Sequence, residues 1–345
     1  MQSSVRHWRV LILAAAVGLC GDQNSRVAHL AQIQTPSEFY SQYLDCRGLP
    51  IRAHRIVSRD ALKIACGKAN RMLRHIPNVR DNLIAAGVEV HVLGRKQMLT
   101  DLPEFTGLKG KWQGNRAFDQ MRGISGLTVV CPEENLLELP DDPYYSMDID
   151  SCVHELAHAI QLEGIAKNLQ DAVQQRYKEA LGDGLWRGQY ASTNEFEFFA
   201  ETSTWYFGGP RPPGQGGGIL LIYDTDGLMS YDPKTFALLD DIYQGRVEIG
   251  KFTYTQAKPL SPKPLGRSAH NAADGLLVID NQTASSFKFY LVTSNGEAML
   301  LGDIIPYERR AVPSSIGYRW LLSDDRDQPV RIFVPQSLYS YAAIE

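Results

Sequence analysis

Two histidines four residues apart, His154 and His158, lie in the stretch 150–161, and Glu155 directly follows the first of them. On an α-helix, positions i and i+4 share one face, so both imidazoles can reach a single metal ion. The neighbouring carboxylate of Glu155 can then take a proton from water at the metal. Chance alone produces this H-E-x-x-H pattern in roughly one chain in a hundred of this length. The pattern therefore needs a third ligand to support it.

A second predicted helix, beginning after Asn194, supplies that candidate. Glu197 and Glu201 lie one turn apart on it among aromatic residues, where two carboxylates repel unless a cation lies beside them. We predict Glu197 as the third metal ligand and Glu201 as an acceptor that orients His154. A solvated acidic edge is the alternative. Glu163 and Glu195 are weaker ligand candidates, because we do not expect their side chains to lie on the same side as that of Glu201.

The joint spacing of these residues resembles that of a known family. His154-Glu-Leu-Ala-His158, then Tyr190, then Asn194-Glu-Phe-Glu197-Phe-Phe-Ala-Glu201 is similar to the anthrax lethal factor-like zinc metallopeptidases. These are gluzincins, which include the Pro-Pro endopeptidases. In that family the carboxylate three residues after the Asn ligates zinc. The tyrosine seven residues before that ligand helps to stabilise the tetrahedral intermediate. The resemblance covers roughly residues 37–245 and includes none of the toxin-delivery domains of lethal factor.

The resemblance implies a zincin-like metallopeptidase domain with one Zn²⁺ and a peptide or protein substrate. It implies metal ligands His154, His158 and Glu197, and catalytic roles for Glu155 as general base and Tyr190 as oxyanion donor. An edge strand ahead of the zinc helix, at 127–130 or nearby, is expected to bind the substrate backbone. Two other hypotheses stay open: a zinc-binding but inactive secreted adhesion or binding protein, and a structural protein without metal.

The N-terminus has the pattern of an export signal. Arg6 and Arg9 precede the apolar run 10–19, which is too short to span a bilayer. We expect a signal peptide over 1–20, an N-terminal extension over 21–36 and secretion, with no stable membrane association. A lipoprotein anchor on Cys20 is the less favoured alternative, because Leu19 is large where such signals prefer a small residue.

Charge and cysteine content fit an exported enzyme. The formal net charge of −4 leaves no basic excess to bind nucleic acid. Four cysteines follow the signal, and an even number in an oxidising compartment suggests two disulfides with three connectivities. We favour Cys46–Cys66 and Cys131–Cys152, the second of which would tie a strand to the zinc helix.

Periodicity predicts the elements that position these residues. We expect a short helix around Phe39 and Tyr43, a helix capped by Ser58, and a helix over 78–86. We expect strands at 88–93 and 127–130, with a mostly irregular stretch over 101–125 between them. An amphipathic helix over 165–181 links the two metal-binding helices, a glycine-rich insertion covers 208–218, and a final helix begins near Pro233. No other histidine shows partner spacing, and His91 is expected to be half-exposed.

The fold class is therefore α+β: a zincin-like domain over 37–255, then a small β-sandwich. The Pro/Lys-rich stretch 256–270 is predicted as a linker. At least five short predicted strands separated by turns indicate a β-sandwich over 271–345. The stretch 279–335 is similar in pattern to the von Hippel-Lindau β domain, and we expect an accessory binding or stabilising role for it. Asn281-Gln-Thr283 has the N-glycosylation pattern.

Overall fold

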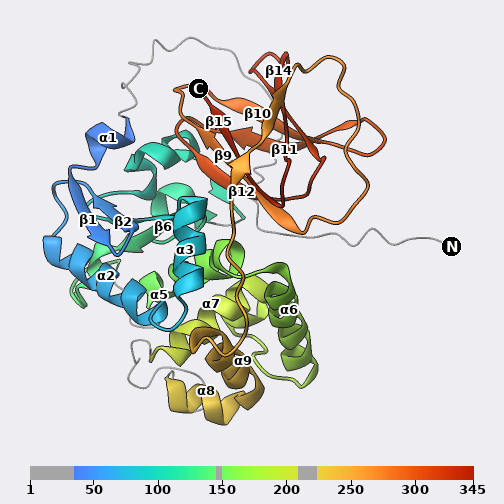
Figure 1. The fold of residues 1–345 in the computed structure, drawn as a ribbon. Helices are drawn as coiled ribbons and strands as arrows, with labels where there is room; N and C mark the ends of the chain where they lie inside the picture. Colours follow the sequence, from blue (N-terminus) through green and yellow to red (C-terminus); the bar gives the residue numbers. More distant parts are fainter. Residues whose placement is uncertain (1–34, 115, 145–149, 209–223) are drawn as a thin grey trace. The chain divides into compact units, whose positions relative to one another are not determined.

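A computed structural model describes residues 35–114, 116–144, 150–208 and 224–345 (Figure 1). These residues fall into two compact units, divided between Tyr254 and Thr255. The expected signal at 1–20 lies outside the described residues, as do nearly all of the extension 21–36 and of the glycine-rich insertion. Within the described ranges, no helix combines the length and the apolar character that crossing a bilayer requires.

The first unit is built on a four-stranded sheet with the order β1-β2-β3-β6. Strand β1 (Gln42–Cys46) pairs antiparallel with β2 (Leu49–Ala53), whereas β2, β3 (Glu89–Leu93) and β6 (Thr128–Pro132) run parallel. Parallel neighbours need crossover connections, and helices supply the one between β2 and β3. The predicted strands at 88–93 and 127–130 are confirmed within two residues at their ends.

Helices occupy most of the rest of this unit. Ser58 caps the second helix by accepting a hydrogen bond from the Asp60 N–H, as expected, and a left-handed Gly87 (φ 78°) ends the third. The helices are α1 (Pro36–Phe39), α2 (Arg59–Met72), α3 (Pro77–Ala86), α4 (Glu133–Leu136), α5 (Ser151–Ala159), α6 (Lys167–Gly182), α7 (Glu195–Tyr206), α8 (Thr225–Tyr231) and α9 (Pro233–Tyr243).

The β1–β2 hairpin corrects the prediction of a helix through Tyr43. Only Pro36–Phe39 is helical, and Tyr43 lies in β1 with half of its surface exposed. Arg47 (φ 56°) and Gly48 (φ 87°) both adopt left-handed backbone between the strands, as a tight hairpin turn requires. The aromatic residues suggested helical spacing, but strand alternation buries Cys46 and Leu49 instead.

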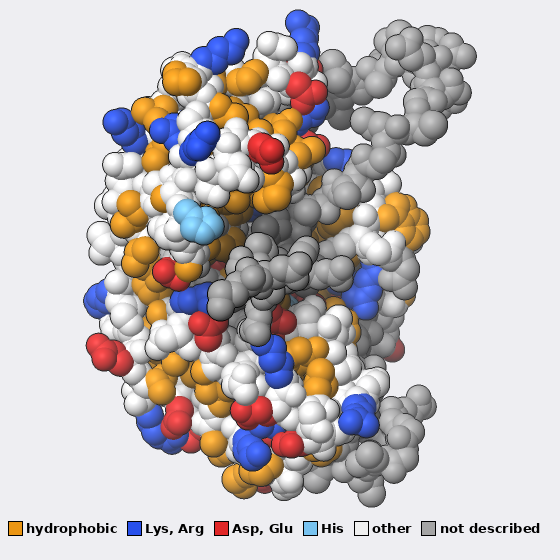
Figure 2. Space-filling model, turned by 90° about the vertical axis from the view of Figure 1, so that its right-hand side faces the viewer, with side chains coloured by type: hydrophobic (Ala, Val, Ile, Leu, Met, Phe, Trp, Pro, Cys, Tyr) orange, Lys and Arg blue, Asp and Glu red, His pale blue; other side chains and the backbone are white. Residues whose placement is uncertain are grey.

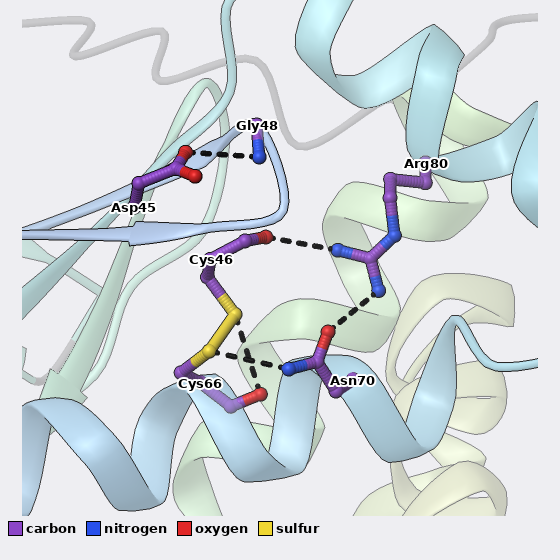
Figure 3. The surroundings of a disulfide bond; sticks show 6 residues. All are labelled: Asp45, Cys46, Gly48, Cys66, Asn70 and Arg80. Atoms are coloured by element: carbon purple, nitrogen blue, oxygen red, sulfur yellow. Dashed lines mark hydrogen bonds between the residues drawn. A yellow bond between two sulfur atoms is a disulfide. The ribbon is translucent and has the colours of Figure 1, made fainter.

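Two disulfides join helices to this sheet, in the pairing that was favoured from the sequence. Cys46–Cys66 links the end of β1 to α2 (Figure 3). Beside it, the Arg80 guanidinium donates to the Cys46 carbonyl and to Asn70 Oδ1, both at 3.0 Å. Cys131–Cys152 links β6 to α5 two residues before His154. The helix that carries both histidines is therefore covalently fixed to the sheet.

The second unit is all-β, which confirms the α+β class. A five-stranded sheet (β11-β10-β13-β14-β8) and a four-stranded sheet (β12-β9-β15-β7) enclose a shared core that includes Leu277, Phe289 and Trp320. The strands are β7 (Thr255–Gln256), β8 (Lys258–Leu260), β9 (Gly275–Asn281), β10 (Phe287–Val292), β11 (Ala298–Ile304), β12 (Arg309–Ser314), β13 (Arg319–Ser323), β14 (Pro329–Val334) and β15 (Tyr339–Ile344).

The linker predicted at 256–270 is wrong at its start. Strand β7 pairs with β15, and β8 pairs with β14 at the edge of the larger sheet. An edge strand tolerates a proline, because one side of its backbone needs no ladder partner. Pro259 therefore fits β8, although its composition suggested an unstructured connection.

The glycosylation pattern at Asn281 is also not usable in the folded chain. The Asn281 side chain is fully buried, and its Nδ2 donates to the carbonyls of Ser285 (2.7 Å) and Ile305 (2.8 Å). Burial with satisfied hydrogen bonds marks it as a structural asparagine. A glycan would need this amide on the surface.

On the face shown in Figure 2, basic and acidic side chains are interspersed among apolar and neutral ones. The described residues of that face form no continuous basic stripe of the kind that tracks a nucleic-acid backbone.

Candidate metal centre

Helix α5 presents the two histidines. Asp150 caps it by accepting from the Val153 N–H at 3.2 Å, and Lys68 forms an ion pair with the same carboxylate. Apolar neighbours on the helix, including Leu156 and Ala157, are buried. The one-turn spacing brings Nε2 of His154 within 3.1 Å of Nε2 of His158.

Helix α7 presents the carboxylate. Asn194 caps it, with Oδ1 accepting from the N–H groups of Phe196 and Glu197 at 2.9 Å each. This cap fixes the first turn, in which Glu197 lies. Glu197 Oε2 lies 3.2 Å from His154 Nε2 and 3.5 Å from His158 Nε2. The structure therefore brings the three predicted ligands together.

The three atoms have the spacing that a divalent metal requires. Zinc bound tetrahedrally at about 2.0–2.2 Å separates neighbouring ligand atoms by about 3.3 Å or slightly more. The observed separations are 3.1, 3.2 and 3.5 Å. Glu197 Oε2 is buried without a hydrogen bond, although it faces both imidazoles. Within the described part of the chain, this group of His154, His158 and Glu197 could hold a metal ion.

The charged groups of this site shift one another's pKa values. Burial acts to lower the pKa of His154, but the carboxylates of Glu197 and Glu201 raise it to about 10. Burial acts to raise the pKa of Glu197, and the two imidazoles hold it well below its usual range. A histidine with a raised pKa holds an extra proton. Metal binding would displace that proton from His154, because imidazole ligates in its neutral form.

Glu201 lies beside His154, as we predicted from the sequence. Its Oε1 is 3.1 Å from Nδ1 of His154, the ring nitrogen that faces away from Glu197. A carboxylate at that nitrogen favours the tautomer whose Nε2 is free to ligate. Thr204, one turn farther along α7, donates to the backbone carbonyl of Glu201 at 2.7 Å.

Glu155 lies against the segment that precedes β6. A Cβ added to Gly123 would meet Glu155 Oε1 at 2.6 Å, so this glycine backbone packs directly on the carboxylate. Ser125 Oγ donates to the Glu155 carbonyl at 2.7 Å, and Ile124 forms an isolated antiparallel bridge with Val130 of β6. Burial raises the pKa of Glu155. A glycine contact of this kind could not be recognised from the sequence.

Tyr190 lies beside the three ligands in a short 3-10 turn, Tyr190–Ser192, ahead of α7. Its ring centroid is 6.2 Å from that of His154, with 27° between the ring planes, and the residue is 45% exposed. Partial burial and the nearby Glu197 raise the pKa of its phenol.

The two weaker ligand candidates lie outside the group. Glu195 accepts a hydrogen bond from Gln174 Nε2 at 3.0 Å. Glu163 lies in a π-helical turn, Ile160–Gly164, that continues α5, and it is only 2% exposed. Burial raises the pKa of Glu163 to about 8, and its Oε2 has no hydrogen-bond partner.

Replacing Glu163 with Gln is expected to stabilise the protein at neutral pH. Between about pH 4, where an unfolded Glu ionises, and about pH 8 the unfolded chain loses a proton that the folded chain retains. Stability of the wild type therefore falls as pH rises through this window. The amide removes that penalty, so Glu163→Gln should gain about 1–3 kcal/mol at pH 7 and little at pH 4. Urea unfolding at both pH values measures the difference, and an equal gain at both would contradict this account.

His91 corrects another expectation. It is 5% exposed rather than half-exposed, with Nδ1 2.5 Å from Glu104 and Nε2 3.1 Å from Glu89. Tyr40 donates to the same Glu104 oxygen at 2.6 Å, and Arg52 pairs with Glu89. The partners come from distant segments, so spacing along the chain could not reveal them.

Comparison with known proteins gives a distant similarity in structure only. No protein-family model matches the chain, and no curated protein matches it. Among solved structures it is similar to the Pro-Pro endopeptidase PPEP-2 from Paenibacillus alvei, with 18% identity. The match covers 51% of this chain and 91% of that chain, with a TM-score of 0.35. A similarity this low carries no argument about function.

Proposed function

We propose that this chain is a secreted zinc-dependent endopeptidase. The observation that carries the proposal is the convergence of His154, His158 and Glu197 around one point, with Glu155 directly after the first ligand. Two imidazoles and one carboxylate with an open fourth position are the donor set of many zinc hydrolases. The two disulfides support export, because such bonds persist in oxidising compartments.

Each residue has a defined part in this proposal. The three ligands hold the ion, which when bound supplies Lewis acidity and lowers the pKa of water. Glu155 accepts the proton of the attacking water and delivers it to the departing amine. The Tyr190 hydroxyl donates a hydrogen bond to the oxygen of the tetrahedral intermediate. Glu201 holds the His154 ring in its ligating tautomer.

In this proposal the substrate backbone would pair with the segment 123–125. The Val130 N–H already donates a hydrogen bond to the Ile124 carbonyl at 2.9 Å, so β6 itself is covered there. The added-strand position expected at 127–130 therefore moves to the neighbouring segment, which also contacts Glu155. A peptide paired with this segment would lie next to the general base.

A combined metal and cleavage experiment tests the proposal. Purified protein should contain about one zinc per chain by elemental analysis and should cleave members of a random peptide library. A chelator should abolish cleavage, and added zinc should restore it. Stoichiometric zinc without any cleavage would favour the alternative, an inactive secreted adhesion or binding protein. Absence of zinc from folded protein would favour a structural protein.

Gly123→Ala is expected to reduce kcat by about 10- to 100-fold, because small displacements of a catalytic group are costly. The new methyl group would meet the Glu155 carboxylate at 2.6 Å, so either the carboxylate or the segment must move. Zinc content should not change, because no ligand is touched. Steady-state peptide cleavage measures the effect. Gly67→Ala is the matched control, since a Cβ there meets no atom within 4 Å and activity should be unchanged.

A further inference from the structure

The proposed role of Tyr190 requires that its side chain be restrained. It lies in a three-residue turn and is 45% exposed, so burial alone does not fix its side chain. An oxyanion donor acts through preorganisation, because its hydroxyl must already point at the position where charge develops. A residue that restrains this ring would therefore affect the proposed reaction without touching the substrate.

Arg116 is in position to do so. Its guanidinium carbon lies over the Tyr190 ring, 5.7 Å from the ring centroid, within the range of a cation–π contact. Arg116 is exposed, and among the described residues no carboxylate lies at ion-pair distance from it. Its recorded contact is the one with the Tyr190 ring.

The element that carries Arg116 is braced. Strands β4 (Trp112–Gln113) and β5 (Arg116–Ala117) form a small hairpin, in which Arg116 pairs with Gln113. The Phe118 N–H donates to the Lys111 carbonyl at 3.1 Å at the base of this hairpin. Asp119, just after it, accepts from the Gly110 N–H at 2.9 Å and from Thr100. The backbone at Arg116 is therefore tied to the body of the unit.

We propose that Arg116 is a positioning residue for Tyr190: its guanidinium holds the phenol ring beside the metal ligands by a cation–π contact. The inference rests on the proposed peptidase function, in which Tyr190 is the oxyanion donor. Within the described residues, Arg116 forms no hydrogen bond or ion pair with the candidate ligands or with Glu155, and its recorded contact is the Tyr190 ring. Its effect should therefore exist only while the Tyr190 hydroxyl is present.

A double-mutant cycle tests this dependence. Arg116→Ala and Arg116→Gln should each lower kcat by about 3- to 10-fold with KM changed less than about 2-fold, whereas Arg116→Lys, which keeps the cation, should stay within about 2-fold of wild type. In a Tyr190→Phe background, Arg116→Ala should have almost no further effect. Lys109→Ala, which removes a charge near the same hairpin, is the control and should match wild type. An equal loss of kcat with and without the Tyr190 hydroxyl would overturn the proposal.

A second measurement does not depend on activity. In protein labelled with 3-fluorotyrosine, the ¹⁹F resonance of Tyr190, assigned with Tyr190→Phe, should be a single shifted line. Arg116→Ala should move it towards the position of free fluorotyrosine, and Arg116→Lys should not. An unchanged resonance in Arg116→Ala would overturn the positioning role. If the wild type cleaves no peptide, the peptidase proposal fails, while this spectrum still decides whether Arg116 holds the ring.

Discussion

Glu155→Gln is expected to keep its metal and lose at least about a thousandfold in kcat, within the range attributed to general acid–base catalysis. Glutamine has nearly the same shape, so it fits beneath Gly123 and leaves the Ser125 hydrogen bond to the residue 155 carbonyl intact. An amide cannot accept the proton of the attacking water. The substitution therefore removes the proton acceptor but leaves the position of the side chain unchanged.

The measurement is kcat on a cleaved library peptide, together with zinc per chain from the same preparation. Glu195→Gln is the matched control, because Glu195 lies outside the ligand group and binds Gln174. We expect that control to retain wild-type turnover. Substantial proteolysis by Glu155→Gln protein free of contaminating proteases would eliminate Glu155 as the base.

His158→Ala is expected to lose the metal itself and all metal-dependent activity. It leaves two ligands, His154 and Glu197, where a structural or catalytic zinc site needs three or more protein donors. Alanine is a good helix former, so α5 should persist, held by the Cys131–Cys152 disulfide. The loss should therefore concern binding rather than folding. Glu197→Ala, which removes the ligand on α7, should also abolish metal binding.

Elemental analysis after dialysis against a mild chelator gives the zinc content, and circular dichroism shows whether the fold is retained. His75→Ala is the control, since His75 is an exposed histidine outside the ligand group. Full zinc occupancy in both His158→Ala and Glu197→Ala would mean that the metal, if bound, lies elsewhere. Such a result would remove the basis of the peptidase proposal.

Some of this site follows from local rules that act within one element. The approach of His154 and His158 is set by the helical repeat, and the Asn194 cap is a short-range hydrogen bond to its own helix. Strand β3 follows from the alternation of side chains at 88–93, and β6 from the short, mostly apolar stretch at 127–130. Local spacing is enough for these features, because the interacting groups lie within a few residues of each other.

Contacts between groups on separate elements depend instead on how those elements pack. The separation of Glu197 from the two imidazoles depends on how α7 packs against α5, and the contact of Gly123 with Glu155 depends on the segment before β6. The buried partners of His91, the hairpin around Gly48 and the strand at Lys258–Leu260 were likewise invisible in the spacing. Residue types and the geometry within each element can be predicted from the sequence. Distances between elements depend on the packing of the whole unit, and only that packing brought Glu155, Tyr190 and the three candidate ligands close together.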